Sequence, residues 1–387
     1  MLIKNGVIHT IDGPVIDRGY VWVEGSRIAG VGGMDALPPE EHFGPVVDVQ
    51  GGHVLPGFLD IHCHLGMIGT AVGFEGEDVN EETAPCTPQL RGLDGVNPMD
   101  EAFAEARRAG VTCVVTGPGS ANAIGGQMVA LKTRGTIADQ MTLRAPAAMK
   151  FALGENPKRI HGKGRQTAPM TRMATAALIR EQLAKAQEYQ YKQEKAELEE
   201  RDKPDFDAGL EALIPVLAGR VPAHFHAHRA DDIATAVRLS REFGLDLTIV
   251  HGTEGRLIAD FLAKEGVPVI TGPFLTDRSK PELRGLAMEN AAALAAAGVR
   301  VAICTDHPET PIQYLPLCAA LAARAGMDEE EALAAITINA ACMAGLDDRL
   351  GSLTIGKDAD VVVMSGHPFD VKSRVQYVWI DGQEVPL

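Results

Sequence analysis

The chain has 387 residues, 45% of them hydrophobic, and a formal net charge of −16. This length can bury a sizeable core, so we expect one large α/β domain with a smaller domain beside it. The acidic charge argues against nucleic acid and against an anionic membrane surface as partners, and no apolar run is long enough to span a bilayer.

The six cysteines form no C-x-x-C pair and no dense framework. This pattern is typical of reduced thiols, so we expect a cytoplasmic protein. The first residues begin a strand-like run and do not resemble a signal peptide.

Short β-like runs alternate with turns in residues 1–50, and similar runs return at 360–364 and 375–382. Neither end has enough apolar surface to form a domain alone. We therefore expect the two ends to meet in one small β-sandwich, made of residues 1–53 and 346–387. Two independent terminal flaps are the alternative.

From residue 54 to 345 strand-like apolar runs alternate with helix-like segments. The strand-like runs are 57–61, 111–115, 147–153, 222–227, 247–250, 267–270 and 299–304, with 127–131 as an eighth candidate. Repeated strand–helix units predict a parallel sheet with right-handed crossovers, and eight strands predict a TIM-like (β/α)8 barrel. An open doubly wound sheet is the alternative, although no G-x-G-x-x-G motif follows a strand.

A helical insertion is expected at residues 168–203. Its second half, 187–201, is almost wholly polar. Such a run is typical of a solvated helix or helical hairpin that projects from the body, and binding of a partner is the minority alternative.

The stretch Gly57–His64 contains a His-x-His pair. Because successive side chains of a strand point to opposite faces, His62 and His64 share a face and can hold one divalent cation, with Asp60 as a plausible neighbour. Further ligand-type residues lie in or directly after later strand-like runs: Lys150, His226, His228, His251 and Asp306. Since strand ends converge on one face of a barrel, these side chains predict one metal site. The alternatives are structural histidines and an Asp306 that only caps a turn.

This pattern resembles the ligand set of the amidohydrolase superfamily. The motif of residues 54–64 is quite specific to that family, and residues 351–360 are similar to its return into the small domain. Among the branches, the sequence is most similar to the imidazolonepropionase-related hydrolases. The resemblance implies a binuclear centre with these ligands: His62, His64 and Asp306 on one metal, His226 and His251 on the second, and a carboxylated Lys150 as the bridge.

A carboxylated lysine is the physically reasonable bridge, because a carbamate offers two anionic oxygens and a neutral amine does not. An unmodified, buried ammonium would be costly, so the alternative is that Lys150 pairs with a carboxylate such as Glu155. Some branches of the family use a glutamate as the bridge, which makes Glu155 an alternative bridging ligand.

Imidazole and carboxylate ligands suit zinc, with iron or manganese as alternatives. A metal lowers the pKa of bound water towards about 7. We therefore expect a metal-activated hydroxide to hydrolyse the C–N bond of a small amide or cyclic amide, with Asp306 as general base and acid. His228 is expected to bind substrate or stabilise the oxyanion, or to support a ligand. Arg159, Arg229 and Lys158 are candidates for holding a substrate carboxylate.

Two other functions stay open at this point. One is a mononuclear ring deaminase of the same superfamily, with a single metal. The other is a non-catalytic relative that keeps the fold for binding. By analogy with the superfamily, we also expect a homo-oligomer.

Overall fold

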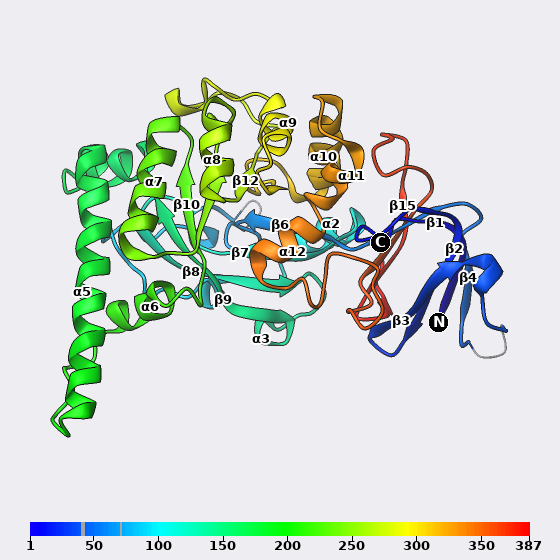
Figure 1. The fold of residues 1–387 in the computed structure, drawn as a ribbon, viewed down its shortest axis with the longest axis horizontal. Helices are drawn as coiled ribbons and strands as arrows, with labels where there is room; N and C mark the ends of the chain where they lie inside the picture. Colours follow the sequence, from blue (N-terminus) through cyan, green and yellow to red (C-terminus); the bar gives the residue numbers. More distant parts are fainter. Residues whose placement is uncertain (40–42, 70–71) are drawn as a thin grey trace.

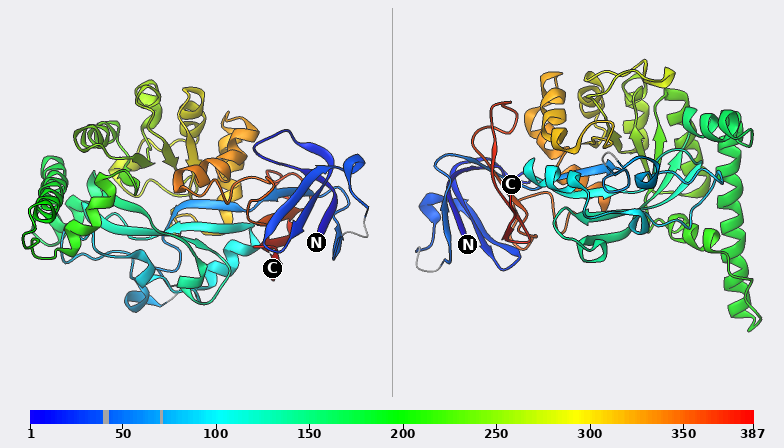
Figure 2. Two further views of the ribbon diagram at one scale, coloured as in Figure 1. Left: turned by 60° about the horizontal axis from the view of Figure 1, so that its bottom comes forward. Right: turned by 180° about the vertical axis from the view of Figure 1, so that it is seen from behind.

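The computed structural model describes residues 1–39, 43–69 and 72–387. Figure 1 shows a larger body with helices along one side and a smaller β lobe, in which both chain ends lie. Figure 2 shows the same arrangement from two other sides. In the described ranges no helix combines the length and the apolar character needed to cross a membrane.

Both ends of the chain build one β-sheet. Its strands among the described residues are β1 (Leu2–Ile8), β2 (Ile16–Glu24), β3 (Arg27–Gly33), β4 (Val46–Asp48), β5 (His53–Pro56), β14 (Val361–Met364), β15 (Val375–Ile380) and β16 (Gln383–Glu384). They run in the order β16-β15-β14-β5-β1-β2-β3, with β4 beside β1. Because β14 pairs with β5, the two chain ends share one hydrogen-bonded sheet, so independent flaps are ruled out. The domain boundaries near residues 53 and 346 stay a prediction.

The larger body is built on a second sheet. Its strands are β6 (Phe58–Cys63), β7 (Val111–Thr116), β8 (Ile124–Lys132), β9 (Thr142–Ala152), β10 (Ala223–Ala227), β11 (Leu247–His251), β12 (Val269–Thr271) and β13 (Val301–Ile303), and they neighbour one another in chain order. Most are buried along their whole length, as expected for strands covered on both faces. The predicted TIM-like barrel is therefore confirmed as a nearly closed sheet.

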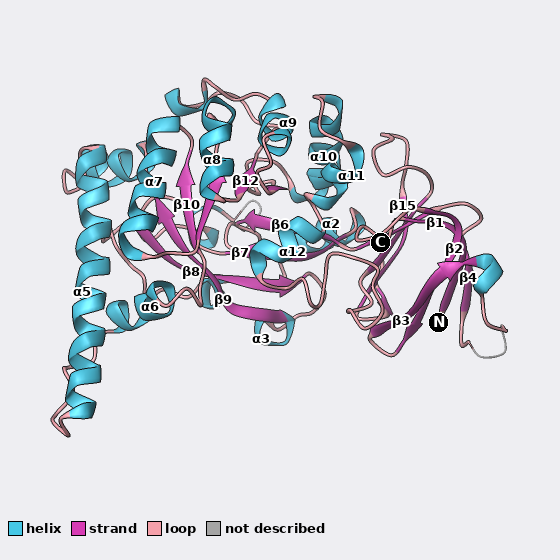
Figure 3. Ribbon diagram, in the orientation of Figure 1, coloured by secondary structure: helices cyan, strands magenta, loops and turns pink. Residues whose placement is uncertain are grey.

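Most helices lie on one side of this sheet, and the short helices α3 (Ala138–Met141) and α6 (Ala208–Leu217) lie on the other (Figure 3). Those in the described ranges are α1 (Gly92–Gly95), α2 (Glu101–Arg108), α3 (Ala138–Met141), α4 (Glu155–Pro157), α5 (Arg172–Leu198), α6 (Ala208–Leu217), α7 (Ala230–Phe243), α8 (Ala259–Glu265), α9 (Glu289–Ala296), α10 (Leu315–Arg324), α11 (Glu329–Ala334) and α12 (Ile338–Ala344). Helix α5 extends past the rest of the body (Figures 1 and 2). It buries only part of its surface, including Ile179 and Leu183, and leaves Leu198 exposed near its end.

One strand departs from the all-parallel sheet that the sequence analysis predicts. Strand β8 is antiparallel to both β7 and β9. A parallel connection needs a crossover of about a dozen or more residues, and the links 117–123 and 133–141 are too short to provide one. The strand is present where it was expected, but it forms an antiparallel insertion between β7 and β9.

The barrel is joined across β6 and β13 by contacts at the ends of these strands. Asp306 N donates to His62 O over 3.1 Å, and His64 N donates to His307 O over 2.9 Å. These backbone bonds hold the segment after β13 against the His-x-His segment, and so they fix the relative positions of His62, His64 and Asp306.

A buried lysine ties the barrel to the terminal sheet. The Lys132 ammonium, at the end of β8, lies 3.1 Å from Asp358, 2.7 Å from Asp360 and 3.2 Å from Asp381. The side chains of Lys132, Asp358 and Asp360 are at most 5% exposed. Asp358 also pairs with Arg27 and Arg349, whereas the ion pair of the buried Asp360 is with Lys132.

We expect Lys132→Met to lower the free energy of unfolding by about 3–5 kcal/mol, because its removal leaves the buried Asp360 carboxylate without its cationic partner. Urea denaturation followed by circular dichroism measures the change. The control is Lys185→Met, which breaks an exposed pair with Glu181 on α5 and should change stability little. Equal midpoints for both variants would contradict the prediction.

Candidate metal centre

The ligand-type residues named from the sequence lie together at the carboxyl ends of the barrel strands. His62 is in β6, Lys150 in β9, His226 in β10 and His251 in β11, whereas His64, His228 and Asp306 follow shortly after β6, β10 and β13. All the histidines in this set and Lys150 are buried, and Asp306 is partly buried. The fold therefore gathers side chains that are far apart in the sequence into one place.

Asp306 is at the centre of the first group. Its Oδ1 lies 3.3 Å from Nε2 of both His62 and His64, and its Oδ2 lies 4.0 Å from Nε2 of His251. Burial alone would raise the pKa of Asp306, but His251, His62 and His64 outweigh it and hold that pKa well below the usual value. An ionised carboxylate thus faces three imidazoles.

In two of the three rings, those of His64 and His251, the other nitrogen is held by a backbone carbonyl, whereas Nδ1 of His62 has no hydrogen-bond partner among the described residues. His64 Nδ1 donates to Gly117 O and His251 Nδ1 donates to Gly272 O, both over 2.8 Å. These bonds fix the tautomer, so each Nε2 carries a free lone pair. Burial also lowers the pKa of His251 to about 4, which keeps the ring neutral and able to ligate.

The backbone is strained at two of these residues. His251 has a φ of 74° and Asp306 a φ of 54°, in the left-handed region that most residues avoid. Such strain persists where the surroundings over-determine the conformation, often at functional sites. Here it aims both side chains at the same point.

Lys150 lies against this group. It is fully buried, and its Nζ is 3.0 Å from His62 Nε2. Burial lowers the pKa of Lys150 to about 8, so the side chain becomes a neutral amine at a lower pH than an exposed lysine does. In the described ranges no ion pair joins Lys150 to Glu155, so that alternative is not formed. Glu155 instead lines the neighbouring cleft, and its backbone N–H donates to Glu282.

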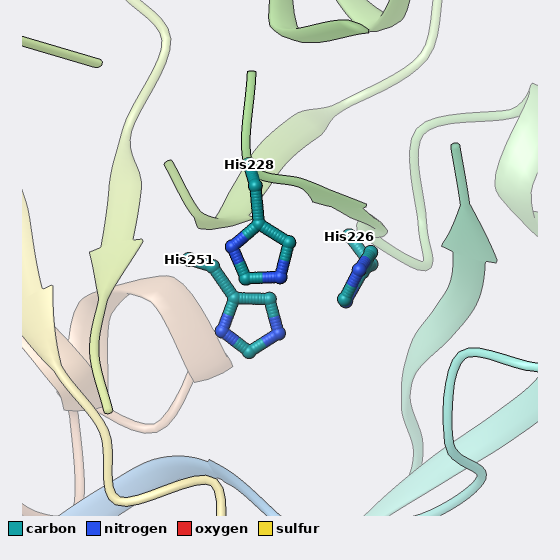
Figure 4. A group of neighbouring side chains, drawn as sticks. All are labelled: His226, His228 and His251. Carbon is teal, nitrogen blue, oxygen red and sulfur yellow. The ribbon is translucent and has the colours of Figure 1, made fainter. Parts of the chain in front are cut away.

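A second group contains a residue that the sequence analysis missed. Nε2 of His226 and Nε2 of His228 each lie 3.7 Å from Oε1 of Glu282, which is only 3% exposed. His226, His228 and His251 offer nitrogens within 4.8 Å of one another, and Figure 4 shows their rings gathered around one point. Glu282 lies in the loop after β12, and a search of all loops that follow barrel strands would have included it.

Asp60, the expected neighbour of the His-x-His pair, is fully buried and engaged in hydrogen bonds. Its oxygens accept hydrogen bonds from His62 N over 3.2 Å, Thr305 N over 3.1 Å and Thr305 Oγ1 over 2.5 Å. The carboxylate therefore joins β6 to the segment after β13 and helps to hold the backbone of His62 in place.

An open cleft of about 450 Å³ leads to the two groups. His64, His226, His228 and Asp306 line it, together with charged side chains from the surrounding loops: Glu155, Arg159, Lys280 and Glu309. The Arg159 side chain could therefore contact a substrate carboxylate in this cleft. Arg229 could not: its guanidinium pairs with Asp231 over 2.7 Å and does not line the cleft, and neither does Lys158.

Comparisons with known proteins agree with this geometry. The model of the amidohydrolase family matches residues 53–385. A crystal structure of an amidohydrolase from Thermotoga maritima has 44% sequence identity and a TM-score of 0.95, and the match covers 99% of both chains. An amidohydrolase of Hapsidospora irregularis is 29% identical over 87% of this chain, which spans only 37% of that relative's length. An imidazolonepropionase of Brucella anthropi is 24% identical, over 94% of this chain and 90% of its own.

Proposed function

The chain belongs to the amidohydrolase family, and we propose that it is a metal-dependent hydrolase that cleaves the C–N bond of a small amide or cyclic amide. The observation that carries the proposal is the position of Asp306, which lies 3.3 Å from both His62 and His64 at the edge of an open cleft.

The side chains fit a divalent metal, because neutral imidazoles and one ionised carboxylate surround a buried point. His62, His64 and Asp306 would hold one ion, His226 and His251 would contribute to a second, and a carboxylated Lys150 would lie between them. Zinc suits these ligands best, with iron or manganese as alternatives. When bound, the metal would acidify a water molecule and polarise the scissile carbonyl.

Asp306 carries the proton in this proposal. Its carboxylate is ionised and reaches the cleft, so it can accept a proton from water and pass it to the leaving nitrogen. His228 also lines the cleft, where it could bind the substrate or stabilise the oxyanion. Its Nδ1 is bonded to Thr253 Oγ1 over 2.7 Å, which fixes the orientation of the ring.

Arg159 is proposed to hold a carboxylate of the substrate. We expect Arg159→Met to raise KM for N-acyl amino acids about 10–100-fold with little change in kcat, because a hydrogen bond to a charged group contributes about 1.5–3 kcal/mol. Steady-state kinetics measure the effect. The matched control is Arg229→Met, which removes a guanidinium outside the cleft and should leave KM unchanged. An unchanged KM in Arg159→Met would remove this role.

The test of the function is a screen of the metal-loaded protein against N-acyl amino acids, dipeptides, lactams and hydantoins, with removal of the metal as the control. A mononuclear ring deaminase is the second candidate, because His62, His251 and Asp306 alone already converge. Ammonia release from a ring amine, with one metal per chain, would favour it. A loaded protein without any turnover would favour a binding role.

A cytoplasmic location and a homo-oligomeric state complete the proposal. The six cysteines are free thiols in the described part of the chain, which is compatible with a reducing compartment. Cell fractionation and light scattering of the purified protein test these two expectations.

A further inference from the structure

Three polar atoms face one another beside the first ligand group: His226 Nε2, His228 Nε2 and Glu282 Oε1. All three are buried, and neither imidazole nitrogen forms a hydrogen bond with the described residues, whereas Glu282 Oε1 is paired with the Lys280 ammonium over 3.0 Å. Each nitrogen is 3.7 Å from the carboxylate oxygen. Buried polar atoms are almost always satisfied in folded proteins, so two unpartnered imidazole nitrogens that face one buried carboxylate indicate a missing ligand.

We propose that His226, His228 and Glu282 form a binding site for a divalent transition metal of the zinc type. In a tetrahedral site with bonds of ~2.1 Å the ligand atoms lie about 3.4 Å apart. The two separations from Glu282 are 3.7 Å, and a ligand nitrogen of His226 and one of His228 lie within 4.8 Å of each other, so the three side chains must draw together around the ion. This ligand set differs from the pair of His226 and His251 that the family resemblance implies. It makes His228 and Glu282 ligands of the second metal.

The surroundings already hold the three side chains in place. Ser120 Oγ is 2.9 Å from His226 Nδ1, and Thr253 Oγ1 is 2.7 Å from His228 Nδ1. The backbone N–H of Glu155 donates to the other oxygen of Glu282 over 3.0 Å. Such partners orient metal ligands and leave one coordinating atom on each side chain.

Lys280 places a positive charge beside Glu282. Its ammonium is 3.0 Å from Glu282 Oε1 and is partly buried. Without a metal this ion pair compensates the carboxylate, so Lys280 and the metal compete for one oxygen. Lys280→Met should therefore tighten binding of the second metal.

The inference deepens the proposed function, since it assigns the ligands of the second metal. Metal binding needs no substrate, however, so the two can fail separately. If the protein binds the second metal through Glu282 but hydrolyses nothing, the metal site is supported and the proposed function is contradicted.

The experiment titrates metal-free protein with Zn²⁺ and with Co²⁺, whose absorption reports a tetrahedral site. The wild type should bind two equivalents. Glu282→Gln should keep one and bind the other more than about 100-fold more weakly, beyond the 10–100-fold typical of a residue that only supports a ligand. His64→Asn should lose the other equivalent.

The control is Glu309→Gln, which removes a carboxylate from the same cleft and should keep both equivalents. Circular dichroism verifies the fold of each variant, and His228→Asn replaces Glu282→Gln if the latter does not fold. The proposal is overturned if the wild type has no equivalent that depends on Glu282, or if the loss in affinity is 100-fold or less.

Discussion

Asp306→Asn is expected to lower kcat/KM by about 10⁴-fold or more. General acid–base catalysis alone contributes up to about 10⁴-fold, and the same carboxylate is a proposed metal ligand. Asparagine keeps the size of the side chain but removes its negative charge and its ability to carry a proton. Steady-state kinetics on a substrate from the screen measure the loss of activity, and metal analysis measures the loss of bound metal.

The structure explains why this substitution should act on chemistry more than on folding. The backbone bond from Asp306 N to His62 O survives the change, so the segment after β13 should stay in place. Glu309→Gln is the matched control, because it removes a carboxylate from the same cleft without touching His62 or His64. Activity of Asp306→Asn within tenfold of the wild type would contradict the proposed role.

The sequence predicts most of this site because strand geometry is regular. The alternation of side chains places His62 and His64 on one face, and a barrel brings every strand end to one mouth. The sequence alone therefore groups His226, His251 and Asp306 at this mouth. Pairing of the terminal strands was also predictable, since neither end could bury enough apolar surface alone.

Other features depend on details that strand patterns do not contain. Glu282 reaches His226 and His228 from a loop, and loop conformation has no period to detect. Arg229 is a candidate for holding a substrate carboxylate, but its guanidinium pairs with Asp231, two residues away, and it does not line the cleft. The reversed direction of β8 could have been foreseen from its short links, which exclude a crossover.

Lys150→Met is expected to lower kcat by about 10³-fold or more and to weaken binding of the second metal, because the proposal makes this residue the bridge. Its Nζ is 3.0 Å from His62 Nε2 in a fully buried position. The neutral amine would add CO₂ to form a carbamate and release one proton. Acetate should partly restore activity to Lys150→Ala, since a free carboxylate supplies the two missing oxygens.

The lowered pKa of Lys150, about 8, gives this prediction a pH dependence. Below that value the ammonium predominates and cannot attack CO₂, so activation of metal-free protein by bicarbonate and Zn²⁺ should slow as the pH falls through about 8. ¹³C-bicarbonate should give a carbamate signal in NMR that is absent from Lys150→Met.

The control is Glu155→Gln, the alternative bridge, which should keep both the signal and the activity. If Glu155→Gln is inactive while Lys150→Met works normally, Glu155 is the bridge and the lysine stays unmodified.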